Sequence, residues 1–230
     1  MENYSWLKQI LEEDTEASAS AVRGSPPAPM TDKQKAVIKA AVELFSEKGY
    51  AATSTREIAR RAGVAEGTIF KQYPTKKDLM LWITERIINK ALFPLISKGL
   101  PELTAKQYGT REEFLSALFL NRAGLMQEGI PLFKIIFQEM PYLPEIRAML
   151  IGQIKKMPLA LIAEKMRMGK DAGSRANNFS ETETIQILLT CISGFFILRS
   201  IMMPELFPKN RLKKDAVTLA RFISRGFDNA

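Results

Sequence analysis

The stretch STREIARRAGVAEGTIFKQY, residues 54–73, decides the fold that the rest of the chain must accommodate. It opens with a capping box, because the Ser54 hydroxyl can accept a hydrogen bond from the Glu57 amide while the Glu57 carboxylate reaches back. Gly63 then allows the left-handed conformation that a tight turn between two helices requires. Together these features predict a helix-turn-helix.

The helix expected after this turn, Glu66 to Tyr73, is barely two turns long and mostly polar. A helix so short is not stable alone and must be held by its neighbours. Its small and polar residues suit a helix presented to the major groove of DNA: Gly67, Thr68, Lys71 and Gln72. The alternative is a surface helical hairpin without a DNA-binding role. The agreement between the capping box, the turn glycine and the short polar helix disfavours it.

The flanking sequence predicts a helix on each side of this segment. An apolar stripe of Ile38, Ala41 and Phe45 favours a helix from Asp32 to Lys48. A second capping box, TKKD at residues 75–78, predicts the start of a fourth helix.

The composition is that of an ordinary globular protein and argues against most enzyme classes. Of the 230 residues, 46% are hydrophobic and 25% are charged. The chain has no histidine, which removes the usual zinc ligand and the usual general base. The acidic pairs Glu112-Glu113 and Glu181/Glu183 are better explained as acids at helix starts. We therefore expect no catalytic residue, no metal and no cofactor, and a small helical enzyme is the least favoured alternative.

The net charge of +8 suits a polyanionic partner without locating its binding face. Residues 1–30 carry a net charge of −3, residues 31–80 carry +4, and the remainder carries +7. The single cysteine, Cys191, excludes an intramolecular disulfide and indicates a reducing compartment.

The most apolar stretch invites a comparison with a membrane span. Residues 184–198 form an uncharged run of 15 residues, short of the ~20 that a bilayer span needs. The first 20 residues lack the features of a signal peptide. We expect a cytoplasmic protein with no membrane partner.

Proline and glycine breaks divide the rest of the chain, and no alternating strand pattern is found in the sequence, so the expected fold is all-α. Residues 1–14 can form an amphipathic helix, and residues 15–30 are an Ala-, Ser- and Pro-rich linker. The expected boundaries are 1–30 for this extension, 31–80 for the helix-turn-helix domain and 81–230 for a long helical domain. In the last, helices are expected at 77–98, 111–127, 130–139, 144–168, 181–203 and 211–227.

The pattern TREIA-x-x-AGV-x-x-GTIF-x-x-Y-x-x-K-x-x-L, residues 55–79, closely resembles the DNA-binding segment of TetR-family transcription regulators. The resemblance implies a three-helix DNA-binding domain followed by a helical domain that binds a small effector and forms a homodimer. It also implies a repressor that binds a palindromic double-stranded DNA operator and is released by the effector.

The resemblance assigns DNA contacts position by position. Arg56 matches a position that contacts a base or phosphate, while Lys71 and Gln72 are the candidates for direct base readout. Lys76 and the first amides of the fourth helix are expected to clamp a phosphate. The full expected set is Ser54, Thr55, Arg56, Glu66, Gly67, Thr68, Phe70, Lys71, Gln72 and Lys76.

Two positions depart from the family pattern. Phe70 stands where tyrosine is usual, so a phenol-to-phosphate hydrogen bond is lost, although the ring can still pack on a sugar or a thymine methyl. Ala65 stands where serine is common, which removes a hydroxyl cap. Tyr73 resembles an aromatic core position of the family.

Aromatic and methionine side chains of the long helical domain would together line an apolar pocket, which favours a hydrophobic effector. Any single one of them is better explained as ordinary core. The expected pocket residues are Trp82, Phe114, Leu118, Arg122, Met126, Phe133, Phe137, Met140 and Met166. Arg122, with Lys134 and Gln138, could anchor a polar head group.

In the family the last two helices pair with their symmetry mates in a four-helix bundle. The small residues Ser193 and Gly194 would allow a close helix crossing there. The expected dimer interface is Ser193, Gly194, Ile197, Ile201, Val217, Phe222 and Ile223. The rival to a specific regulator is a nonspecific architectural DNA-coating protein, which predicts steep salt dependence with little sequence preference.

Overall fold

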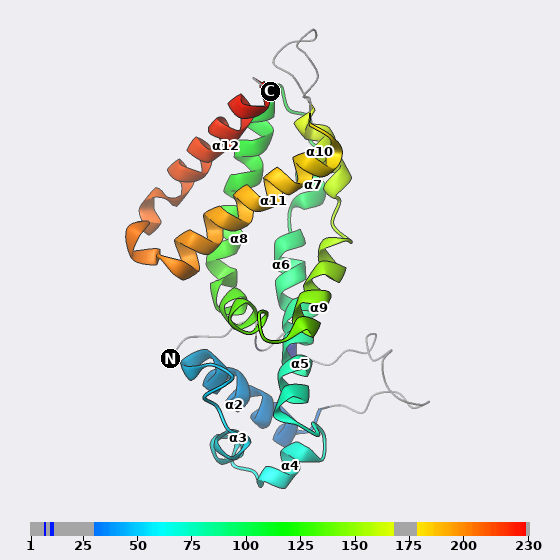
Figure 1. Cartoon of the computed structure of the whole chain (residues 1–230), viewed down its shortest axis with the longest axis vertical. Coiled ribbons are helices and arrows are strands. Elements are labelled where there is room, and N and C mark those ends of the chain that lie inside the picture. The colour runs from blue at the N-terminus through cyan, green and yellow to red at the C-terminus, as the bar shows by residue number, and fades with distance from the viewer. Residues whose placement is uncertain (1–6, 8–9, 12–29, 168–178, 229–230) are drawn as a thin grey trace. The chain divides into compact units, whose positions relative to one another are not determined.

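The computed structural model describes residues 7, 10–11, 30–167 and 179–228, and every regular element in these ranges is helical (Figure 1). The all-α prediction is confirmed. Most of the expected N-terminal helix and the linker lie outside the described ranges, but Leu7 and Ile10 are described as helical and buried. None of the described helices combines the length and apolar character of a membrane span.

The chain divides into two compact units. The first comprises residues 1–94 and 131–152, and the second comprises residues 95–130 and 153–230. The boundary expected at residue 80 falls inside α5 (Lys76–Arg86), which the first unit contains whole. Leu79, Met80 and Ile83 are buried along α5, so this helix belongs to the core of the unit that precedes it.

In the first unit, α2 (Asp32–Lys48) supplies the apolar support for the helix-turn-helix. A capping box between Thr31 and Gln34 starts α2, and the helix buries Ile38, Ala41 and Phe45 as its periodicity predicts. The helix-turn-helix itself consists of α3 (Thr55–Ala62) and α4 (Glu66–Phe70).

The long helix that follows is interrupted by a π-helical segment. After α5 come η1 (Ile87–Leu92), which is π-helical, and α6 (Phe93–Ser97). Pro94 has no N–H to donate to the Lys90 carbonyl, and the wider π turns come directly before it. The sequence predicted the extent of this helix but not its change of winding.

The second unit is built from α7 (Leu100–Ala105), α10 (Leu159–Met166), α11 (Glu181–Ile197), α12 (Leu212–Asp228) and the N-terminal part of α8 (Arg111–Glu139). Figure 1 shows α11 and α12 joined through η2 (Leu198–Met202), η3 (Pro204–Leu206) and η4 (Lys209–Arg211). Its core consists of Leu100, Phe114, Leu115, Leu118, Phe119, Ile162, Met166, Leu188, Ala216, Ala220, Ile223 and Phe227.

Two expected helix boundaries are wrong. The break expected at residues 129–131 does not occur, because α8 runs without interruption through Pro131. A proline removes one hydrogen bond, and the packing of the buried Ile135 and Ile136 farther along α8 offsets that loss. Conversely, the single helix expected over 144–168 is divided into α9 (Pro144–Ile154) and α10, because Pro158 cannot continue a helix and instead precedes α10 as its N-cap residue.

Candidate nucleic-acid interface

The turn between α3 and α4 forms as the sequence predicts. The Ser54 hydroxyl accepts from the Glu57 amide, and the Glu57 carboxylate accepts from the Ser54 amide at 3.0 Å. Gly63 is left-handed, with φ 67° and ψ 33°, and its amide donates to the last carbonyls of α3. Ile58 and Ile69 are buried on the inner sides of the two helices, so their polar residues are turned outward.

The candidate reading surface combines the start of α3 with α4 and the turn after it. Arg56, Lys71 and Gln72 are exposed, and their side chains make no hydrogen bond or ion pair with another described residue. The Phe70 ring is 44% exposed beside them, and Gly67 is exposed with nothing within 4 Å of the position that a Cβ atom would take. These groups can therefore meet a ligand without first breaking a contact inside the protein.

Helix α4 is shorter than expected and is held from both ends. It ends at Phe70, and Ala65 at its N-cap makes no side-chain capping bond, as the substitution for serine predicts. Tyr73, just beyond the helix, is buried and packs edge-on against Trp82 with ring centroids 5.7 Å apart. Burial raises the pKa of Tyr73 to about 12, in keeping with a core role.

Thr55 and Glu66 contact one another instead of pointing to solvent. The Thr55 hydroxyl donates to the Glu66 carboxylate at 2.6 Å, and both side chains are half-buried. A hydroxyl that already donates its proton cannot also donate to a phosphate. In this arrangement the pair fixes the start of α4 against the start of α3.

Lys76 is not extended toward solvent either. Its ammonium donates to the carbonyls of Tyr50 and Thr53, each at 2.8 Å, and lies 4.2 Å from the centre of the Tyr50 ring. Desolvation by burial lowers the pKa of Lys76. The side chain therefore braces the loop between α2 and α3, and the phosphate clamp that the sequence predicted here is not preformed.

Two ion pairs that sequence reasoning missed hold α3 against α2. Lys48 pairs with Glu57 at 2.6 Å, and the Arg61 guanidinium binds the Glu47 carboxylate through two bonds of 2.7 and 3.1 Å. The Lys48 ammonium, followed by the Ser54 amide and hydroxyl, lowers the pKa of Glu57 to about 2. The charges of Lys48 and Arg61 are thus already compensated, whereas Arg56, Arg60 and Lys71 are exposed and pair with no described acid.

Within the first unit, the start of α5 is tied to α9, and the loop between α2 and α3 is tied to the end of α8. The Lys77 ammonium lies 2.6 Å from the Glu145 carboxylate, and the Tyr50 amide donates to Glu139 at 3.2 Å. Glu139 is buried although it is an acid. No sequence pattern indicated this pairing, since the partners lie 89 residues apart.

The expected effector residues are divided between the two units. Phe114, Leu118 and Met166 pack together in the core of the second unit. In the first unit, Phe133 stacks on Phe137 with centroids 5.9 Å apart, and Trp82 packs on Tyr73. Met140 is half-buried, also in the first unit, and the Met126 side chain lies outside the described part.

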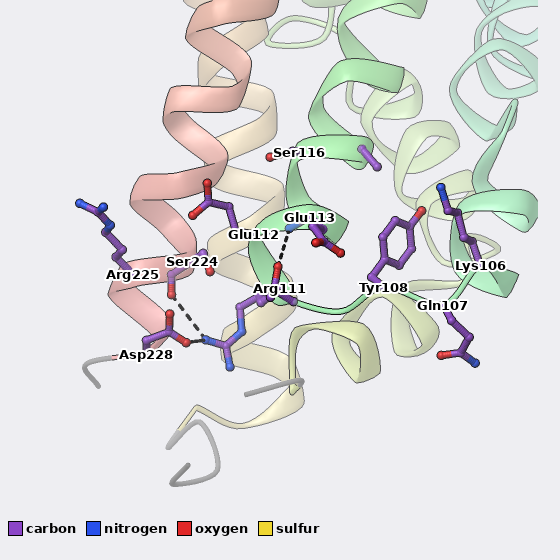
Figure 2. A pocket seen from close by; sticks show the side chains of 12 residues that line it. Lys106, Gln107, Tyr108, Arg111, Glu112, Glu113, Ser116, Ser224, Arg225 and Asp228 are labelled. Carbon is purple, nitrogen blue, oxygen red and sulfur yellow. Dashed lines mark hydrogen bonds and ion pairs between the residues drawn. The ribbon is translucent and has the colours of Figure 1, made fainter. Parts of the chain in front are cut away.

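A pocket of about 630 Å³ lies at one end of the second unit (Figure 2). It is lined by polar residues of the loop before α8, the first turns of α8 and the last turns of α12, and by none of the expected effector residues. Much of its charge is already paired: Arg111 binds Asp228 at 2.6 Å, Glu112 binds Arg221 at 2.9 Å, and Glu113 accepts from the Gly109 amide.

The expected dimer residues lie on α11, η2 and α12. Phe222 is 75% exposed and Ser193 is exposed, while Gly194, Ile197 and Val217 are half-buried. Ile223 is instead part of the core of the second unit, and the Ile201 side chain lies outside the described part. Further apolar side chains are exposed on the same segment: Leu189, Leu198, Met202, Met203 and Leu206.

The described residues contain no cluster of three or more acidic or cysteine side chains that could hold a metal ion. The acids near the helix-turn-helix have other contacts. Glu57 and Asp78 complete capping boxes, and Glu47 and Glu145 are paired with cations.

Comparisons with known proteins agree with this geometry. The family model for bacterial regulatory proteins of the tetR family matches residues 37–83, which span most of α2, the helix-turn-helix and most of α5. The chain is also similar to the HTH-type transcriptional repressor BepR of Brucella suis biovar 1 (strain 1330). The two are 28% identical over 171 residues, which cover 71% of this chain and 78% of the relative.

Two solved structures share the fold over most of the chain. A transcriptional regulator from Saccharomonospora viridis in complex with choline has a TM-score of 0.57 at 19% identity, and the match covers 81% of this chain and 94% of that one. The regulator FadR of Bacillus subtilis in complex with stearoyl-CoA has a TM-score of 0.53 at 19% identity, and the match covers 80% of this chain and 96% of that one.

Proposed function

Because this chain belongs to the TetR family and is a DNA-binding transcriptional regulator, we propose that it represses transcription from a palindromic operator and leaves that operator when a small hydrophobic effector binds. The sign of regulation is supported by BepR, which is named a repressor. The observation that carries the proposal is the exposed, uncompensated polar surface of α3 and α4, which a buried apolar side holds in place.

We assign base readout to Arg56, Lys71 and Gln72. A guanidinium can bind guanine O6 and N7 through two bonds, and the glutamine amide can do the same with adenine N6 and N7. Gly67 allows the backbone of α4 to approach the DNA closely, and the Phe70 ring packs on a sugar or a thymine methyl. Exposure of all five residues supports this assignment.

The remaining expected residues are assigned to positioning and to the backbone. Thr68 and the amides at the start of α5 bind phosphate. Thr55 and Glu66 set the angle of α4 against α3, and Lys76 braces the loop between α2 and α3, as their contacts within the protein suggest. Ser54 keeps the first turn of α3 capped.

We propose that the protein acts as a homodimer through α11, η2 and α12. A palindromic operator needs two reading surfaces about 34–36 Å apart, which is one turn of DNA. Exposed apolar side chains on this segment support the assignment, because a stable monomer would bury most of them. Two copies related by a twofold axis would cover them with one another.

The proposed effector acts by linkage. A ligand that binds better to a conformer with another separation of the reading surfaces must lower operator affinity. The two ligand-bound neighbours carry choline and stearoyl-CoA, one a small cation and the other a long acyl thioester. They support ligand binding by this fold.

Competition binding tests this function. A labelled fragment of the promoter upstream of the protein's own gene is bound by the full-length protein and displaced with unlabelled promoter or with bulk genomic DNA. A specific regulator should prefer the promoter by at least ~10³-fold. Equal displacement by both DNAs, with affinity falling steeply as salt is raised, would instead indicate the nonspecific DNA-coating protein.

A further inference from the structure

Three arginines of the second unit are buried among the described residues, and they differ in how their charges are compensated. Arg111 is 3% exposed and binds Asp228 at 2.6 Å, and Arg199 is 6% exposed and binds Asp215 at 2.7 Å. Arg122 on α8 is 7% exposed and binds no described carboxylate.

The partners of Arg122 are all neutral. Its terminal nitrogens donate to the carbonyls of Ile96 and Lys98, near the end of α6, and to the side-chain oxygen of Asn121. Its Nε–H is buried and has no hydrogen-bond partner in the described part. One donor of the guanidinium is therefore left unsatisfied in the interior.

A buried cation without a counter-ion is unfavourable unless hydrogen bonds or an anion compensate it. Desolvation lowers the pKa of Arg122 to about 10, so the group still carries its charge at neutral pH. The carbonyl ends of α6 offer only partial negative charge. The site thus has a full positive charge and lacks a full negative one.

The surroundings of Arg122 are apolar along α8. Leu118 and Phe119, one turn earlier, are 2% and 0% exposed, and Leu125 in the next turn is also buried. A small inorganic anion would gain little from these side chains. A molecule with an anionic head and a hydrocarbon tail would satisfy the guanidinium and the apolar side chains together.

We propose that Arg122 is the anion receptor of the effector site, and that the effector is an amphipathic carboxylate. This inference rests on the proposed effector-responsive function and specifies its ligand class. One carboxylate oxygen accepts from the Nε–H of Arg122, and the tail lies among apolar side chains of α8. Because Nε is closed off from solvent, the side chains that cover it move aside when the ligand enters.

The pocket of Figure 2 is the obvious competitor for this role. Its buried guanidinium, Arg111, already has Asp228 as counter-ion and also donates to the Met166 carbonyl at 2.6 Å. An incoming carboxylate there would compete with a carboxylate already bound. No described carboxylate competes for Arg122, and for this reason we place the anion-binding site at Arg122 on α8.

Three probes with the same ten-carbon chain separate head-group charge from tail burial. The full-length protein is titrated calorimetrically with decanoate, decanol and decyltrimethylammonium, and the same probes are added to the promoter complex. We expect decanoate to bind at least tenfold more tightly than either other probe and to be the most effective in releasing the promoter. Equal affinity for decanoate and decanol, or no binding of any probe, would overturn the inference.

Variants of Arg122 distinguish anion binding from a merely structural role. Arg122→Gln keeps a polar side chain of shorter reach but has no charge, and it should bind decanoate no better than decanol. Arg122→Lys keeps the charge and should retain the preference for decanoate. Arg147→Gln, a control on an exposed arginine, changes the net charge equally and should behave as the wild type.

The outcomes are separable if a variant folds poorly. Equal weakening of decanoate and decanol binding in Arg122→Gln and Arg122→Lys would assign the residue to structure and reject the inference. The wild-type preference for decanoate tests the ligand class even if neither variant folds. If the promoter preference holds while decanoate is not preferred, only this inference fails. If the promoter preference itself is missing, the proposed function fails.

Discussion

Basic residues that look equivalent in the sequence of the helix-turn-helix have different surroundings in the structure. Lys71 is exposed and contacts no described acid, whereas Lys48 is neutralised by Glu57 and Lys76 donates to two backbone carbonyls. A backbone carbonyl has no side-chain signature, so no sequence pattern can show that Lys76 has acceptors 23 and 26 residues away. By contrast the Ser54 and Thr75 capping boxes are local, and the sequence predicted both.

Lys76→Met should destabilise the protein by about 1–3 kcal/mol, because it leaves two carbonyls without a charged donor. Lys77→Met is the matched control, since its pair with Glu145 is exposed to solvent and should contribute little to stability. Urea unfolding measures both. If Lys76→Met is as stable as the control and instead lowers the salt slope of promoter binding by about 1, Lys76 contacts phosphate rather than the loop.

At the scale of helices, capping motifs and turn residues in the sequence predicted where some helices begin and end. They did not predict helix boundaries that depend on tertiary packing. The turn glycine and the two capping boxes defined α3 and the start of α5. The uninterrupted course of α8 through Pro131 could not be predicted, because it depends on contacts of residues that are distant in the sequence. The π-helical η1 was missed for another reason, because a proline such as Pro94 can bend, end or widen a helix and the pattern does not show which.

Two glycines of the helix-turn-helix should respond to alanine in opposite ways. Gly63 is left-handed, so Gly63→Ala should destabilise the fold by about 1–2 kcal/mol. Gly67 lies inside α4 and has open space at its Cβ position, so Gly67→Ala should stabilise that helix by up to about 1 kcal/mol.

Gly67→Ala should also change DNA binding. Gly67→Ala should weaken promoter binding at least tenfold although the protein is no less stable, because the added methyl group faces the DNA. Thermal unfolding and fluorescence anisotropy measure the two effects on one preparation. A Gly67→Ala protein that binds the promoter normally would remove α4 from close contact with DNA.

At the scale of the whole molecule, the proposed regulator needs two copies of the chain and an effector that changes their affinity for the operator. The family resemblance was readable from one 25-residue pattern and the helical class from the absence of a strand pattern. The sequence did not show that residues 131–152 belong to the first unit. The sequence also did not show which buried arginines of the second unit have a counter-ion. Arg111 and Arg199 each bind an aspartate in the folded chain, whereas Arg122 binds backbone carbonyls.

Phe222→Glu should shift the protein toward monomer and weaken promoter binding. The ring is 75% exposed, so the substitution should leave the fold of one copy unchanged while placing two buried charges in the proposed interface. Tyr142→Glu, at a tyrosine that is 79% exposed elsewhere, is the control and should remain dimeric. Analytical ultracentrifugation decides this: a dimeric Phe222→Glu protein with an unchanged dissociation constant would place the interface on another surface.

Reading of base sequence by α4 and the turn after it is tested most directly by the promoter preference of a double variant. Lys71→Ala with Gln72→Ala removes two proposed base contacts, each worth about 1–3 kcal/mol of discrimination. The ratio of promoter affinity to bulk-DNA affinity is measured for this variant and for the wild type at the same salt concentration. We predict a ratio of at least ~10³ for the wild type and a loss of at least tenfold in the variant, with bulk-DNA affinity changed much less. An unchanged ratio in the variant would contradict this reading of base sequence.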